Sequence, residues 1–104
     1  MTLREFLLGF VRLHILYHAA QGPVYGTWLM EELAHHGYTF SPGTLYPILH
    51  GLEKSGYLRS EKQVSEGRQR RYYRITPEGE AALTEVRVRL KELVKEVLDL
   101  ESPD

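Results

Sequence analysis

The chain has 104 residues, a net charge of −1 and no cysteine. The lack of cysteine excludes disulfide bonds, thiolate chemistry and cysteine-ligated zinc, and it is consistent with a cytoplasmic protein. A chain of this length forms one small domain of modest stability, so we expect a second subunit to add to its core.

The first predicted helix covers residues 1–20. Thr2 and Glu5 have the spacing of a capping box, in which both side chains accept backbone N–H groups at the start of a helix. Charged residues interrupt this stretch, so we expect neither a targeting segment nor a membrane span. The apolar residues cover more than one face, and such a helix needs two packing partners. Those predicted to meet a second subunit are Leu3, Leu7 and Phe10.

A second helix is predicted over residues 25–36 and a third over residues 41–55. Ser41 is a suitable N-cap, Pro42 suits the first helical position, and Gly56 provides a left-handed stop. Two helices joined by a short connector are typical of a helix-turn-helix, whose second helix enters the major groove of DNA. The residues of this helix predicted to contact DNA are Ser41, Thr44, Tyr46, Pro47, His50 and Lys54.

Residues 57–75 predict a β-hairpin, the wing of a winged helix-turn-helix, with a loop at residues 64–68 where Gly67 allows a positive φ. Residues 53–74 contain seven Lys and Arg against three Glu, a local charge of +4. Such a local field attracts a phosphate backbone whatever the total charge. An ordinary solvated hairpin can have the same composition, and it is the neighbouring helix that favours DNA binding. The cations predicted to bind DNA are Lys62, Arg68, Arg70, Arg71 and Arg74.

The last predicted helix covers residues 77–100 and begins after Thr76. Its apolar residues alternate steps of three and four, which is the a/d pattern of a coiled coil. Residues 75–104 carry eight acids against four cations, so we expect this segment to face away from DNA. We predict a homodimer built from the first and last helices, the alternative being a last helix folded back on its own domain. The interface residues predicted in this helix are Leu83, Val86, Leu90, Leu93, Val97 and Leu100.

Four motifs in this order resemble the PadR family of bacterial and archaeal transcriptional regulators, over about residues 3–83. They are Gly22-Pro23-Val24-Tyr25-Gly26, Ser41-Pro42-Gly43-Thr44-Leu45-Tyr46-Pro47, Leu52-Glu53 with Gly56, and Arg71-Tyr72-Tyr73-Arg74-Ile75-Thr76-Pro77 with Gly79. The resemblance implies a winged-helix homodimer that binds a palindromic operator on double-stranded DNA, usually to repress. It also implies a small aromatic or drug-like effector that often releases the DNA. The length resembles the short branch of the family, with one terminal dimerisation helix.

We therefore predict an α+β, mostly helical fold in which residues 1–104 form a single winged-helix DNA-binding domain. The predicted function is sequence-specific regulation of transcription. The alternative is a winged-helix protein-interaction module without specific DNA binding, which explains the fold but gives the wing arginines no role. No nucleophile with a placed base and no phosphate-binding glycine loop is visible, so we predict neither an enzyme nor a cofactor.

His14 and His18 are one helical turn apart and could bind a metal ion from the same face. No third ligand stands at motif spacing, and cysteine is absent. His35 and His36 fall in the last turn of a predicted helix, where the helix dipole favours a cation. The sequence therefore predicts no metal site.

Overall fold

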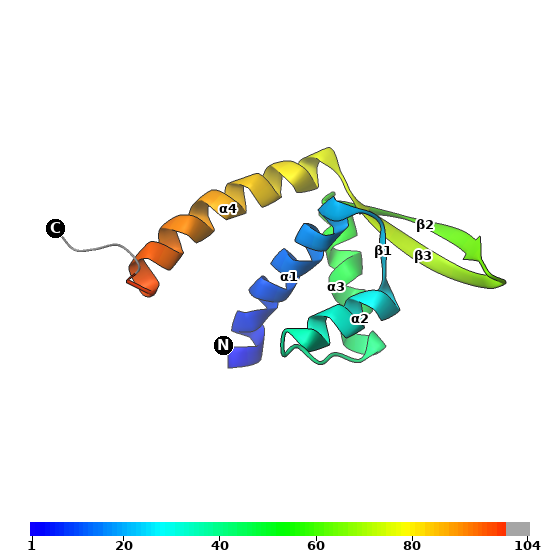
Figure 1. Ribbon diagram of the computed structural model, residues 1–104, viewed down its shortest axis with the longest axis horizontal. Coiled ribbons are helices and arrows are strands. Elements are labelled where there is room, and N and C mark those ends of the chain that lie inside the picture. Colours follow the sequence, from blue (N-terminus) through cyan, green and yellow to red (C-terminus); the bar gives the residue numbers. More distant parts are fainter. Residues whose placement is uncertain (100–104) are drawn as a thin grey trace.

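The computed structural model describes residues 1–99 and contains four helices and a small antiparallel sheet (Figure 1). The helices are α1 (Leu3–Gln21), α2 (Gly26–His35), α3 (Pro42–Lys54) and α4 (Pro77–Val97), and the strands are β1 (Val24–Tyr25), β2 (Leu58–Ser65) and β3 (Arg68–Ile75). The arrangement is a winged helix-turn-helix, with α2 and α3 as the helix pair and the β2–β3 hairpin as the wing. The predicted α+β, mostly helical fold is confirmed.

Helix α1 begins at the predicted cap. Thr2 Oγ1 accepts a hydrogen bond from the Glu5 amide at 3.1 Å. One face of the helix buries Val11, Ile15 and Leu16 in the core. Within residues 1–99, no helix combines the length and apolar character that crossing a membrane requires.

One hydrophobic core joins all four helices and the sheet. Leu83, near the start of α4, is only 3% exposed and belongs to this core. We predicted it as part of the dimer interface, and this assignment is corrected, because the first turns of α4 pack on their own chain before the helix leaves it. The buried hydrophobic residues of this core are Val11, Ile15, Leu16, Ala19, Val24, Leu29, Leu33, Leu45, Leu49, Leu52, Leu58, Tyr73 and Leu83.

The sheet has the order β1-β3-β2. The short strand β1 was not predicted, and it pairs with the middle of β3 through Val24 opposite Tyr73. The predicted loop at residues 64–68 is too long, because β2 and β3 stay paired up to Ser65 and Arg68. The turn is only Glu66-Gly67, with φ values of 53° and 75°, as a two-residue hairpin turn requires. The predicted positive φ of Gly67 is confirmed.

Helix α3 has Ser41 at its N-cap position, but the Ser41 side chain makes no capping bond. The predicted N-cap position is therefore confirmed, but capping by the Ser41 hydroxyl is not. The Thr44 amide instead donates to the Ser41 carbonyl oxygen at 3.0 Å, and the two hydroxyl oxygens of Ser41 and Thr44 lie 3.5 Å apart. At the other end, Gly56 has a φ of 85°, consistent with the predicted stop.

Helix α4 begins at Pro77, and Thr76 Oγ1 caps it by accepting a hydrogen bond from the Gly79 amide at 2.9 Å. Beyond its first turns it extends away from the other helices, at the end of the molecule opposite the wing (Figure 1). The longest dimension of the molecule is 60 Å. The helix ends at Val97, and Leu100 lies outside the described residues. The extended part exposes a series of apolar side chains, Val86, Val88, Leu93, Val97 and Leu98.

Candidate nucleic-acid interface

Helix α3 lies between the core and the solvent. Its inner face buries Leu45, Leu49 and Leu52. Of the six residues of this helix predicted to contact DNA, Thr44 and Tyr46 are half-buried, whereas the exposed ones are Ser41, Pro47, His50 and Lys54. The helix therefore presents a polar face that contains no acidic residue before Glu53.

Tyr46 is less free than the sequence predicted. Its ring lies directly against the first residue of α2, so that a Cβ atom at Gly26 would overlap the Tyr46 hydroxyl and ring. Glycine is the residue that permits this approach. Tyr46 thus fixes the spacing between α2 and α3, and only the part of its side chain that lines a groove remains accessible.

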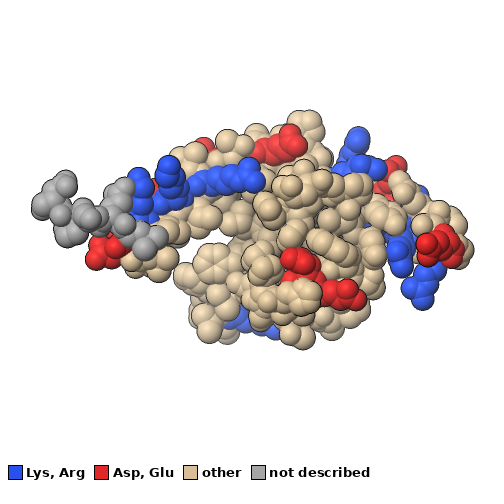
Figure 2. Space-filling view, viewed as in Figure 1, with Lys and Arg blue, Asp and Glu red and all other residues tan. Residues whose placement is uncertain are grey.

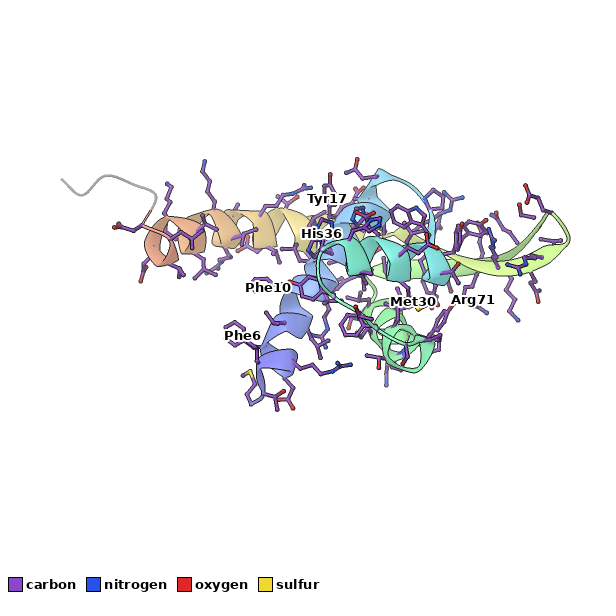
Figure 3. All side chains as sticks on the ribbon, turned by 60° about the horizontal axis from the view of Figure 1, so that its bottom comes forward. Phe6, Phe10, Tyr17, Met30, His36 and Arg71 are labelled. Carbon is purple, nitrogen blue, oxygen red and sulfur yellow. The ribbon has the colours of Figure 1, made fainter. Side chains whose placement is uncertain are left out.

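This groove brings α3 and the wing together. It has a volume of about 300 Å³, and Tyr46 shares it with Arg68, Arg70 and Arg71 of β3. The start of α2 closes its other side with Gly26 and Thr27. Figure 3 places Arg71 where the hairpin joins the helices. Three of the predicted wing cations therefore lie beside the predicted recognition helix.

Arg70 is held in place by an aromatic side chain that the sequence analysis did not assign to the site. Its guanidinium carbon lies 4.4 Å from the centre of the Tyr25 ring, a cation–π contact. Tyr25 in turn packs edge-on against Tyr72, with ring centres 5.4 Å apart. Tyr25 could have been found from the motif Gly22-Pro23-Val24-Tyr25-Gly26, because this motif places an aromatic residue directly before α2.

Arg71 is held by a polar chain that begins on α3. Glu53 Oε2 accepts hydrogen bonds from the Ser60 amide at 3.0 Å and from the Ser60 hydroxyl at 2.8 Å. Arg71 Nη1 donates to the same Ser60 hydroxyl oxygen at 3.0 Å. The nearby Tyr73 is fully buried, and burial raises the pKa of its hydroxyl. In the sequence Glu53 is one of three acids among the cations and part of the Leu52-Glu53 motif, whereas in the structure it positions Arg71 through Ser60.

The other two wing cations predicted to bind DNA are Arg74, at the base of the hairpin, and Lys62 on β2. Arg74 Nε is 3.6 Å from Glu61 Oε1, so part of its charge is compensated within the hairpin. Lys62 is exposed and does not line the groove. Figure 2 shows Lys and Arg side chains over the wing with acidic side chains among them, and further Lys and Arg along α4. The positive charge of the interface is therefore concentrated where the wing meets α3.

A second hollow of about 700 Å³ lies between α1, α2 and α4. Phe10, Leu13 and Tyr17 of α1 and Leu90 of α4 give it an apolar wall. Three histidines, His14, His18 and His36, line its polar end. Burial lowers the pKa of His14, and the neighbouring His36 and His18 lower it further, whereas Glu32 acts in the opposite direction. The spacing along the chain indicated only His14 and His18 as a pair of possible metal ligands, because His36 follows a different helix.

The sequence and the fold are similar to those of known proteins. Residues 15–85 match the family described as "Transcriptional regulator PadR-like family". The chain is 60% identical to the "Transcriptional regulator Rv3488" of Mycobacterium tuberculosis, over 92% of this chain and 90% of that protein.

Solved structures show the same resemblance. A PadR-like transcriptional regulator from Bacillus cereus superposes with a TM-score of 0.83 at 32% identity, covering 96% of this chain and 99% of that one. A PadR family transcriptional regulator from Eggerthella lenta gives a TM-score of 0.79 at 33% identity, covering 98% and 90%. The family consists of transcriptional regulators, as the sequence predicted. The chain belongs to the PadR-like family of transcriptional regulators.

Proposed function

We propose that this protein is a repressor that binds a palindromic operator as a homodimer. The observation that carries the proposal is the groove in which Tyr46 of α3 meets Arg68, Arg70 and Arg71 of the wing. A recognition helix specifies bases, and adjacent cations hold the phosphate backbone in register. Both requirements are met on one side of the molecule.

In this proposal α3 enters the major groove. Thr44, Pro47 and His50 lie toward base edges, because helix-turn-helix proteins read bases with the first turns of the recognition helix. Lys54 at the end of α3 meets a phosphate, as do Lys62 and Arg74 on the wing. Ser41 and the groove arginines complete the contact surface.

Homodimer formation is supported by apolar side chains that the single chain leaves exposed. Leu3 and Phe6 at the start of α1 are 73% and 63% exposed, and Leu93 and Val97 on α4 are 52% and 67% exposed. Phe6 projects away from the rest of the chain (Figure 3). Contiguous exposed apolar residues mark interaction sites. We assign Leu7, Phe10, Val86 and Leu90 to the same interface.

Relief of repression by a small molecule is supported by the hollow between α1, α2 and α4. Its volume of about 700 Å³ falls within the range of sites for small ligands. Phe10, Tyr17 and Tyr38 supply aromatic walls suited to a planar aromatic or drug-like effector. A ligand between α1 and α4 would change the angle of the dimerisation helix and thereby the distance between the two α3 helices.

Selection of binding sites from a random duplex library by the purified protein tests this function. We expect an enriched palindrome whose half-site centres are about 10 base pairs apart, or a multiple of that spacing. In a reporter assay, the selected site placed over a promoter should lower transcription when the protein is expressed. A protein-interaction module would enrich no sequence, and one asymmetric site bound by a single subunit would contradict the dimeric arrangement.

A further inference from the structure

Three imidazoles from two helices converge at the polar end of the hollow between α1, α2 and α4. His14 and His18 lie one turn apart on α1. His36, which Figure 3 labels, directly follows α2. One ring nitrogen of each lies within 4.8 Å of the corresponding nitrogen of the other two. The rings of His14 and His36 stack with centres 4.6 Å apart. Spacing along the chain did not indicate this set, because its third member comes from another helix.

A carboxylate supports the three rings. Glu32 Oε1 lies 3.2 Å from His36 Nε2 and 3.6 Å from His18 Nε2. In metal sites, a carboxylate that accepts a hydrogen bond from one imidazole nitrogen orients the ring so that the other nitrogen can bind the metal. Glu32 has this relation to His36, and it lies within ion-pair distance of His18.

The surroundings allow a cation to enter and to stay. The His18 side chain is 15% exposed, whereas that of His36 is 45% exposed and opens to the hollow. The aromatic side chains of Trp28 and Tyr38 contact His18 and His14 edge-on, which limits the motion of both rings. Arg87 of α4 lines the same hollow. The site is thus sheltered on the α1 side and open on the α2 side.

We propose that His14, His18 and His36 bind one divalent transition-metal ion of the Zn²⁺ type, with Glu32 orienting the imidazoles. Three imidazoles without thiolates suit Zn²⁺, Ni²⁺ or Co²⁺ better than Mg²⁺ or Ca²⁺, which prefer oxygen ligands. Nitrogen ligands of a tetrahedral Zn²⁺ are about 3.3 Å apart, so small changes of side-chain rotamer close the observed set around an ion. The fourth position faces the hollow and takes water.

A metal at this position would join α1 to α2. Helix α2 carries Gly26, whose contact with Tyr46 fixes the position of α3. Because His36 follows the C-terminal end of α2 and Gly26 begins the helix, the ion binds at the end of α2 that lies away from the DNA-binding groove. The site itself does not depend on the proposed repressor function, because its test measures the metal alone.

The experiment titrates Zn²⁺ into the full chain, without a polyhistidine tag, in competition with a chromogenic chelator. We expect one Zn²⁺ per chain. Co²⁺ in place of Zn²⁺ should give the intense visible absorption of a four-coordinate nitrogen site. His14→Gln and His36→Gln should each weaken binding at least tenfold, because each removes one of three ligands.

Two matched controls separate the site from surface histidines. His35 adjoins His36, but its side chain is 78% exposed and does not belong to the three-histidine set. His50 is exposed on α3. His35→Gln and His50→Gln should bind Zn²⁺ as the unchanged chain does. Unaltered stoichiometry and affinity in both His14→Gln and His36→Gln, or no binding by the unchanged chain, would overturn the proposal.

Thermal unfolding gives an independent measurement. Zn²⁺ in excess should raise the Tm of the unchanged chain and of His35→Gln by several degrees, because a ligand that binds only the folded state stabilises it. It should leave the Tm of His36→Gln almost unchanged. His36 is exposed, so this variant remains informative even where His14→Gln impairs folding. An equal rise of Tm in His36→Gln would contradict the assigned ligands.

Discussion

The Ser60 hydroxyl donates a hydrogen bond to Glu53 Oε2 at 2.8 Å, which joins the first residues of β2 to the last turn of α3. The Ser60 amide donates to the same oxygen, and Arg71 donates to the Ser60 hydroxyl. A cation of the wing is therefore fixed relative to the recognition helix by one carboxylate. Removal of any member of this chain should loosen the wing without unfolding the core.

Ser60→Ala should lower the free energy of unfolding by about 1 kcal/mol, because it removes one side-chain hydrogen bond of a partly buried carboxylate. Urea unfolding measures this loss. Amide hydrogen exchange along β2 should increase, because the hairpin loses its attachment to α3. Ser65→Ala, near the exposed turn of the hairpin, is the control and should change neither quantity. Equal effects of the two substitutions would show that the Glu53 contact does not hold the wing.

Replacement of Arg70 and Arg71 by alanine should weaken binding to operator and random duplex alike, since both are proposed to meet the sugar–phosphate backbone. The slope of log K against log salt should become shallower by about two, as expected for two lost phosphate contacts. Fluorescence anisotropy at several salt concentrations measures this slope. Arg89→Ala with Lys91→Ala removes the same charge from α4 and should leave it unchanged. A wing variant with the original slope would place these arginines outside the interface.

Leu93→Asp should convert the proposed dimer to monomer, because a carboxylate in the α4 seam costs several kcal/mol of association. Leu93 is 52% exposed in the single chain, so the monomer should remain folded. Val88 is 62% exposed on the same helix but lies off the predicted seam, which makes Val88→Asp the control. Sedimentation equilibrium distinguishes monomer from dimer. A dimeric Leu93→Asp, or monomers from both variants, would move the interface away from this seam.

The pKa of His14 is lowered by burial and by His36 and His18, so its unfolded form binds a proton more tightly than its folded form. Linkage then requires that folding stability falls as the pH drops below about 6.5, the ordinary value for histidine. With a chelator present, His14→Gln should lose less stability between about pH 8 and pH 5 than the unchanged chain. Chemical unfolding at the two pH values measures the difference. His50→Gln, on the exposed face of α3, should retain the full pH dependence.

Much of the fold follows from local chemistry. Thr2 and Thr76 cap their helices through hydroxyl groups at the positions that the sequence indicated, and Gly56 and Gly67 adopt the positive φ values expected of them. These features depend on neighbours within a few residues. A sequence pattern that local geometry determines can be recognised without the rest of the molecule.

The contacts that the sequence did not predict join distant segments. Strand β1 has only two residues, too few for an alternating pattern, and it exists because β3 offers hydrogen bonds to it. Leu83 fits the heptad spacing of a dimer seam, but it lies in the core of its own chain. Periodicity alone does not distinguish a seam residue from a core residue. His36 joins His14 and His18 only when α2 packs across α1. In the candidate interface, the cations could be predicted from composition, whereas their anchoring by Tyr25 and Ser60 required the tertiary structure.

The contact between Gly26 and Tyr46 has an evolutionary consequence. Because a side chain at position 26 and a tyrosine ring at position 46 compete for the same space, position 26 cannot gain a side chain while the tyrosine ring keeps its place, whereas position 46 can take a smaller residue beside glycine. A lineage that acquires alanine at position 26 must first, or at the same time, replace the tyrosine by a smaller residue. In descendants of this sequence, a side chain at position 26 should therefore be accompanied by a smaller residue at position 46, although twenty positions separate the two along the chain.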